Sequence, residues 1–236
     1  MAERKHIKDI VSGIVSSIDK TLTVNEIDPA TAEARSTKLY ICDLKWANVN
    51  DFVLDDQERE AQIREVGENY IVVYKTDPFI WDSNIATLQT AFYYQSGTPL
   101  DVNAEWLQIN LTSESKLPLF WLYLPVVETN FKNGQGLDRE SEIRLYIIEQ
   151  TNMTDFLVND HFTNVVKYLW AYYEAFFEAL KKDKSFANIE SVETRELYRF
   201  GSETEQGFES NIIDANLSAL ECRFTLPIRK NSKCLC

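Results

Sequence analysis

Histidine and cysteine are scarce in this chain of 236 residues, which contains two His and four Cys. Four cysteines are too few to build a disulfide scaffold in a chain of this length. Cys234 and Cys236 would supply half of a zinc site, but the other ligands would have to come from distant residues, so we expect no zinc centre. His6 and His161 lack a serine or cysteine partner in a catalytic motif, and we expect structural or solvent-exposed roles for both.

Long apolar runs are also missing. The longest, at 117–127, is about half as long as a membrane span and contains Pro118 and Pro125. The first residues are charged and include no apolar segment of the kind found in signal peptides. We therefore expect a soluble protein that is not exported and does not bind membranes.

Basic residues are outnumbered, with 24 Lys+Arg against 37 Asp+Glu and a formal net charge of −13. Proteins that wrap nucleic acid present a basic face, and anionic membrane surfaces attract basic segments. The charge therefore excludes both classes as first choices.

Catalytic and cofactor motifs are absent from the sequence. There is no Gly-x-Gly-x-x-Gly, no Gly-Lys-Ser/Thr and no Gly-x-Ser-x-Gly, and the Gly134-Gln-Gly136 segment lies in a polar stretch between two expected strands. The densest acidic cluster, at 55–60, has no EF-hand spacing, and we interpret it as a solvated turn. We expect no catalytic residue, no cofactor and no metal.

Two amphipathic helices are the clearest local patterns. Apolar residues at 7–18 recur with helical spacing, and a second stripe covers 162–180. Asn159 or Asp160 is the expected N-cap of the second helix, and three lysines follow its end.

Alternating apolar residues predict two groups of strands. The first five are short and suggest a small curled sheet or barrel, whereas four longer ones follow in the second half. Together with the helices, they predict a single α+β domain over 1–236, in which a long amphipathic helix packs on a curled antiparallel sheet. The expected strands lie at 22–27, 39–41, 52–54, 62–66, 70–75, 119–127, 142–149, 192–200 and 220–228.

Residues 77–116 do not continue this alternation of apolar residues. They carry a net charge of −4 and several aromatic residues without clear periodicity, so we expect an insertion within the domain. Aromatic side chains outside a helical stripe, and basic residues in a polar loop or near the C-terminal end, are candidates for contact with other subunits. These subunit-interface candidates are Trp81, Tyr93, Tyr94, Trp106, Lys132, Arg139, Trp170, Arg229, Lys230 and Lys233.

Four stretches of the chain carry a resemblance to a known family. They are the first helix with Thr21-Leu-Thr-Val and 39–46, then 117–128, then 143–152 with Asp160-His161 and the long helix, and finally 216–228 with the terminal Cys-x-Cys. In these stretches the chain resembles the neck and tail-completion ring proteins of crAss-like tailed phages that infect Bacteroides. The resemblance implies a tail-completion or tail-terminator-like α+β subunit, and it implies no catalytic residues.

The expected function follows from this resemblance. It implies a structural virion protein of the neck or tail, assembled in the host cytoplasm, that forms a homo-oligomeric ring around the DNA channel. Its partners would be adjacent neck and tail proteins, such as a portal-side ring or the tail hub, and genomic DNA that passes without specific binding. The alternative is an interaction module that recruits a host factor or an accessory virion component through 77–116. A metal-dependent hydrolase is the less favoured third hypothesis.

Overall fold

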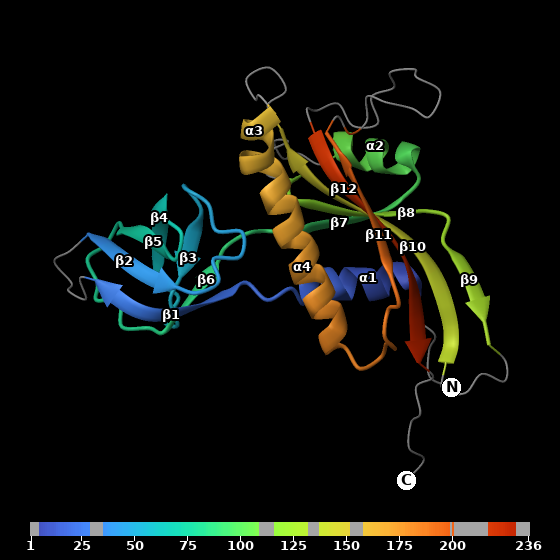
Figure 1. Ribbon diagram of the computed structural model, residues 1–236, viewed down its shortest axis with the longest axis horizontal. Coiled ribbons are helices and arrows are strands. Elements are labelled where there is room, and N and C mark those ends of the chain that lie inside the picture. The colour runs from blue at the N-terminus through green and yellow to red at the C-terminus, as the bar shows by residue number, and fades with distance from the viewer. Residues whose placement is uncertain are drawn as a thin grey trace, which may run out of the picture. The chain divides into compact units, whose positions relative to one another are not determined.

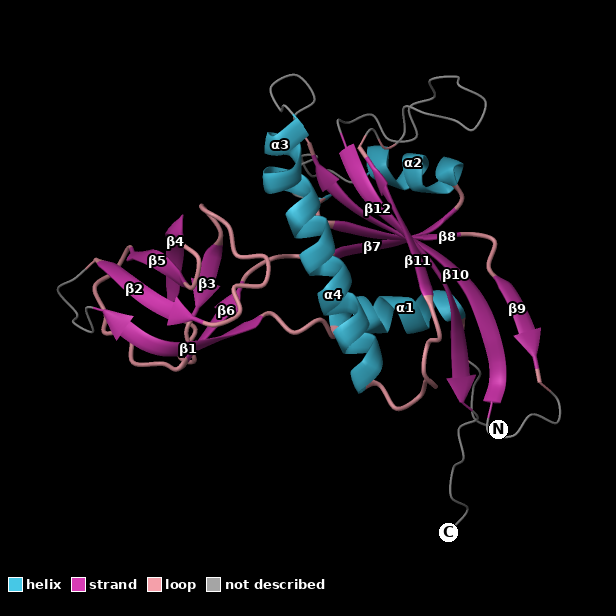
Figure 2. Cartoon of the chain, viewed as in Figure 1, coloured by secondary structure: helices cyan, strands magenta, loops and turns pink. Residues whose placement is uncertain are grey.

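The computed structural model describes residues 5–28, 35–108, 116–131, 137–151, 158–198, 200 and 217–229. The chain forms two compact units where we expected one domain. One unit is Asp19–Ala91, and the other combines Met1–Ile18 with Phe92–Cys236. The mixture of helices and antiparallel strands confirms the α+β class (Figures 1 and 2).

The Asp19–Ala91 unit is a closed barrel of six antiparallel strands in the order β1-β2-β5-β4-β3-β6. Each strand turns alternate apolar side chains inward, as their spacing predicts. Leu39, Ile63 and Ile71, for example, are fully buried. The expected curled sheet is thus confirmed, with the strands β1 (Thr21–Asp28), β2 (Ser36–Ile41), β3 (Phe52–Leu54), β4 (Glu60–Val66), β5 (Tyr70–Lys75) and β6 (Ile85–Leu88).

Strand β6 closes the barrel because it pairs with β1 on one side and with β3 on the other. It comes from the stretch 77–116, which we expected to be an insertion. The structure instead divides this stretch, since 77–91 belong to the barrel unit and the residues after them belong to the other unit.

The second unit is built on a sheet with the order β11-β12-β10-β8-β7, and β9 pairs with β10 beside β8. Strands β7 and β8 are parallel, and the other pairs are antiparallel. The bounds are β7 (Tyr93–Gly97), β8 (Leu119–Tyr123), β9 (Val127–Asn130), β10 (Leu137–Gln150), β11 (Val192–Leu197) and β12 (Leu217–Arg229). Pro227 lies in β12 beyond the residues that pair with β11, consistent with its expected position at an edge or strand end.

The two predicted helices pack on one face of this sheet. Helix α1 (Ile7–Ser16) contacts β7 and β8, and α4 (Lys167–Lys182) contacts β10, β12 and α1. Phe120 of β8 stacks on Phe176 of α4 at a centroid distance of 5.8 Å.

The long helix begins earlier than expected and contains an irregular turn. Helix α3 (Val158–His161) precedes the π-helical turn η2 (Phe162–Val166), which runs into α4. The expected caps at Asn159 and Asp160 therefore lie inside the helix. A π turn contains an extra residue and shifts the phase of the helix. Phe162 thereby leaves the buried stripe and is 60% exposed.

Helix α2 (Pro99–Gln108) covers part of the opposite face of the sheet. Thr98 and Asp101 form a capping box at its start, in which Asp101 Oδ2 accepts from the Thr98 backbone N–H at 2.9 Å. Val102 and Trp106 then pack on Trp121 and Tyr146 of the sheet.

Two of the interface candidates are buried within these units. Trp81 is fully buried in the barrel unit, and Trp106 lies in the core between α2 and the sheet. Their side chains are therefore unavailable to another subunit, and the expectation that they contact one is corrected. Among the described residues, no helix is both long and apolar enough to cross a membrane.

Candidate functional site

The face of the sheet that bears α2 also carries a group of charged side chains beyond the core. Strand register places Arg195, Glu221 and Tyr146 in one row across β11, β12 and β10. Glu193, Arg223 and Arg144 form the next row. We call this group the charged face, and it consists of Arg144, Glu193, Arg195, Glu221 and Arg223.

Glu221 is the centre of the charged face and is 2% exposed. Its Oε1 atom accepts from Arg144 Nε at 2.5 Å and from Arg223 Nε and Nη2 at 2.8 Å each. The hydroxyl of Tyr146 donates to the same oxygen at 3.3 Å. Because burying a carboxylate is costly unless it is paired, these donors explain how an acidic residue is accommodated under the surface.

The charges around Glu221 determine its ionisation. Burial alone would raise the pKa of this carboxyl, but the hydrogen bonds and charges of Arg223 and Arg144 outweigh burial and hold the pKa below its usual value. Burial and the neighbouring Glu221 raise the pKa of the Tyr146 hydroxyl. Glu221 is therefore an ionised structural carboxylate, which is the opposite of what a general acid requires.

The arginines remain accessible although they hold Glu221. The side chains of Arg144 and Arg223 are 36% and 45% exposed, and Arg195 is exposed. Arg144 also lies over the rings of Tyr123 and Tyr146, at 4.9 and 5.3 Å, which fixes the plane of its guanidinium. Planar guanidinium groups bind carboxylates and phosphates through paired hydrogen bonds, so this surface is suited to an anionic group.

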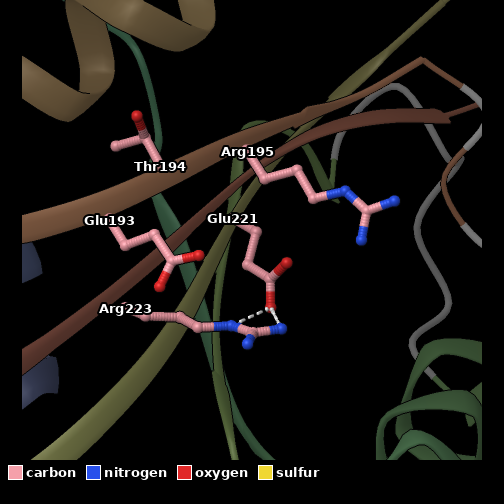
Figure 3. A pocket seen from close by; sticks show the side chains of 5 residues that line it. All are labelled: Glu193, Thr194, Arg195, Glu221 and Arg223. Atoms are coloured by element: carbon pink, nitrogen blue, oxygen red, sulfur yellow. Dashed lines mark hydrogen bonds and ion pairs between the residues drawn. The ribbon is translucent and has the colours of Figure 1, made fainter.

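A shallow hollow lies within the charged face. Glu193, Thr194, Arg195, Glu221 and Arg223 line it. Figure 3 shows that Glu193, Glu221 and Arg223 gather together, whereas the guanidinium of Arg195 extends away from them. The hollow is thus lined by both negative and positive side chains, and the guanidinium of Arg195 points away from the other charged groups.

A second polar pair joins the long helix to β12. His161 Nε2 lies 2.8 Å from Ser218 Oγ, a serine partner that the sequence did not reveal. Ser218 Oγ donates to the Tyr198 carbonyl at 3.0 Å, and in the tautomer that carries the proton on Nε2, His161 donates to Ser218. A catalytic base would have to accept the hydroxyl proton of Ser218. We interpret the pair as a link between α3 and β12.

The remaining interface candidates do not gather at one place. Tyr93 and Tyr94 are half-buried on β7, and burial raises the pKa of Tyr94. Trp170 is half-buried and donates through Nε1 to Glu196 at 2.7 Å. Arg229 is exposed at the end of β12.

Arg139 requires a correction, because it is 3% exposed. It pairs with Glu128 at 3.4 Å and donates to the backbone oxygen of Lys5 at 2.6 Å, so it connects β10 to the N-terminal segment of its own unit. Lys132, Lys230 and Lys233 lie outside the described residues.

Sequence reasoning did not single out Arg144, Arg223 or Arg195. Arg144 and Arg223 each alternate with inward-facing apolar residues, which predicts a solvent-facing row on each strand. That alternation was the available signal. Arg144 and Arg223 lie opposite each other only because β10 pairs with β12 in this register, and no local pattern encodes that pairing.

Metal ligands do not cluster in the described part of the chain, where no three His, Cys, Asp or Glu side chains could hold one ion. The chain matches no protein-family model, no curated protein and no solved structure. The charged face is therefore interpreted from its own chemistry.

Proposed function

We propose that this chain is a structural virion protein, a ring-forming subunit of a phage neck or tail connector that surrounds the DNA channel. The family resemblance in the sequence motivates the proposal, including a tail-completion or tail-terminator-like role. A mixed α+β unit with a long helix on a mostly antiparallel sheet agrees with the coarse architecture that the resemblance implies.

The charged face is the observation that carries this proposal. A ring requires a heterologous interface, in which one patch of a subunit binds a different patch of the next copy. The accessible arginines of the charged face provide one such patch. The barrel unit carries 14 Asp+Glu against 7 Lys+Arg, a net charge of −7, and provides surface of the opposite sign.

The alternative, an interaction module that recruits a host factor or an accessory virion component through 77–116, stays a second hypothesis. This stretch supplies a barrel strand, a strand of the second sheet and α2, so it is part of both units. Deleting 80–110 would disrupt both units and would not separate the two hypotheses.

Mass measurement in solution tests the proposal. Native mass spectrometry and negative-stain imaging of the purified full chain, alone and with neck and tail proteins, are expected to show closed rings of one copy number. A chain that remains monomeric at high concentration in both conditions would overturn the proposal.

A further inference from the structure

We infer that the charged face binds the acidic turn at residues 55–60 of the barrel in a second copy of this chain. This inference rests on the proposed function, because it names the two patches through which ring neighbours would contact each other.

The acidic turn connects β3 to β4 and is held in one conformation by internal bonds. Asp55 Oδ1 accepts from the backbone N–H groups of Gln57 and Arg59 at 2.9 and 2.8 Å. Asp55 Oδ2 pairs with Arg59 Nε at 2.6 Å, and Arg59 Nη2 pairs with Asp82 at 2.7 Å. The one basic side chain of the turn is thus engaged by carboxylates of its own barrel.

Three carboxylates of the turn remain on the surface. Asp56, Glu58 and Glu60 are exposed, whereas Asp55 is buried. Because the turn is ordered by Asp55 and Arg59, binding a partner through it would cost little additional ordering. The turn therefore presents a preformed anionic group.

The charged face complements this turn in sign and in chemistry. Three accessible side chains of this face are positive, Arg144, Arg195 and Arg223. One accessible side chain, Glu193, is negative, because Glu221 is buried. Glu142, exposed on the next row of β10, marks the limit of the positive area. Arginine pairs with carboxylates through two parallel hydrogen bonds, and an aromatic support such as that under Arg144 orients one of these donors in advance.

The two patches belong to different units, so the contact is heterologous and can propagate from copy to copy. A phosphate backbone would satisfy the same arginines. The second copy is favoured because the chain itself carries the complementary carboxylates in an ordered turn, whereas its net charge of −13 opposes DNA.

Charge reversal in the full chain tests the inference. Arg195→Glu alters the charged face, and Asp56→Lys with Glu60→Lys alters the acidic turn. Lys181→Glu on α4 and Glu26→Lys with Asp28→Lys on β1 are matched controls, because they make the same charge changes at other exposed positions. Circular dichroism and thermal melting confirm that each variant folds.

Each interface variant alone is expected to lose the ring, with self-association weakened at least tenfold, while the controls assemble as the wild type does. Mixing the two interface variants should restore assembly, because the intact turn of one variant binds the intact face of the other and the two reversed patches complement each other in charge. The chain that combines all three reversals should recover assembly.

Rings that persist in both interface variants would overturn the inference and leave the proposed function standing. Intact rings with weakened binding to a DNA duplex in Arg195→Glu would also overturn it and would assign the charged face to phosphates. A wild-type chain that never assembles contradicts the proposed function itself.

Discussion

Arg144 and Arg223 lie directly opposite each other on β10 and β12, and both donate to the same oxygen of Glu221. Like charges that face each other across a sheet repel and destabilise the pairing. The buried carboxylate removes this repulsion at the centre of the longest strand pair of the second unit. Glu221 therefore stabilises the sheet and positions the arginines of the charged face.

Replacing Glu221 with glutamine tests that role. We expect the free energy of unfolding to fall by about 1–3 kcal/mol, because the amide leaves two opposed guanidinium groups without a counter-charge. Denaturant unfolding followed by tryptophan fluorescence measures the change. Glu193→Gln, an exposed neighbour in the hollow, is the control and should shift stability by less than about 0.5 kcal/mol. Equal effects of the two substitutions would contradict the central role of Glu221.

Asp51, the residue before β3, predicts a pH dependence in the barrel unit. Burial raises the pKa of this carboxyl to about 6, although the Asn48 backbone N–H donates to it at 2.9 Å. Between the ordinary value of 3.8 and about 6, the folded chain holds a proton that the unfolded chain releases, so stability falls as pH rises through this window. The free energy of unfolding of Asp51→Asn, relative to that of the wild type, should therefore be about 1–3 kcal/mol higher at pH 7 than at pH 4.

Thermal melting at pH 4 and pH 7 measures this difference. Asp56→Asn, at an exposed position in the acidic turn, serves as the control for the change of an acid to an amide. The same gap between Asp51→Asn and wild type at both pH values would show that Asp51 does not titrate in this window.

The barrel is expected to fold without the rest of the chain, because all six of its strands lie within Asp19–Ala91. The fragment 19–91 should unfold cooperatively and show a strand-rich circular dichroism spectrum. The fragment 19–76 should remain unfolded or aggregate, because β1 and β3 both lose β6 as a partner. Equal folding of both fragments would show that β6 is dispensable for closure.

Ser218 is expected to be chemically inert, because its hydroxyl proton is donated to the Tyr198 carbonyl. A fluorophosphonate probe should therefore leave the chain unlabelled. Ser218→Ala should lower stability by about 1–2 kcal/mol through the loss of hydrogen bonds to His161 and Tyr198. Ser16→Ala, at an exposed position in α1, is the comparison and should change stability by less than about 0.5 kcal/mol. Labelling that disappears in Ser218→Ala would show a reactive serine.

Elements with strong periodicity could be predicted from the sequence. The stripe at 7–18 gives α1, and the alternation around Leu39 and Ile71 gives barrel strands with buried side chains. The division into two units could not be predicted, because α1 and β1 are separated by only a few residues and composition does not change between them. The π turn was missed for a related reason, since a shift of one residue leaves the apolar spacing on either side intact.

The candidate site was less accessible to prediction than the fold. Trp106 looked unassigned because its partners lie on strands that periodicity does not connect to it. Trp81 is buried and lies against Phe79, in a segment without periodicity of its own. Arg139 looked like a loop cation, yet β10 extends past it and buries it. Local patterns place a residue on one face of a strand, and only the strand register determines what that face meets.

The first and last strands of the barrel are neighbours. Thr21 pairs with Thr87, and the Leu88 backbone N–H donates to the Lys20 carbonyl at 3.0 Å. The polypeptide therefore enters and leaves this unit at the same place, as a loop does. Recombination could therefore exchange or remove the barrel as one piece. The flanking segments α1 and β7 would keep their places in the unit of the second sheet.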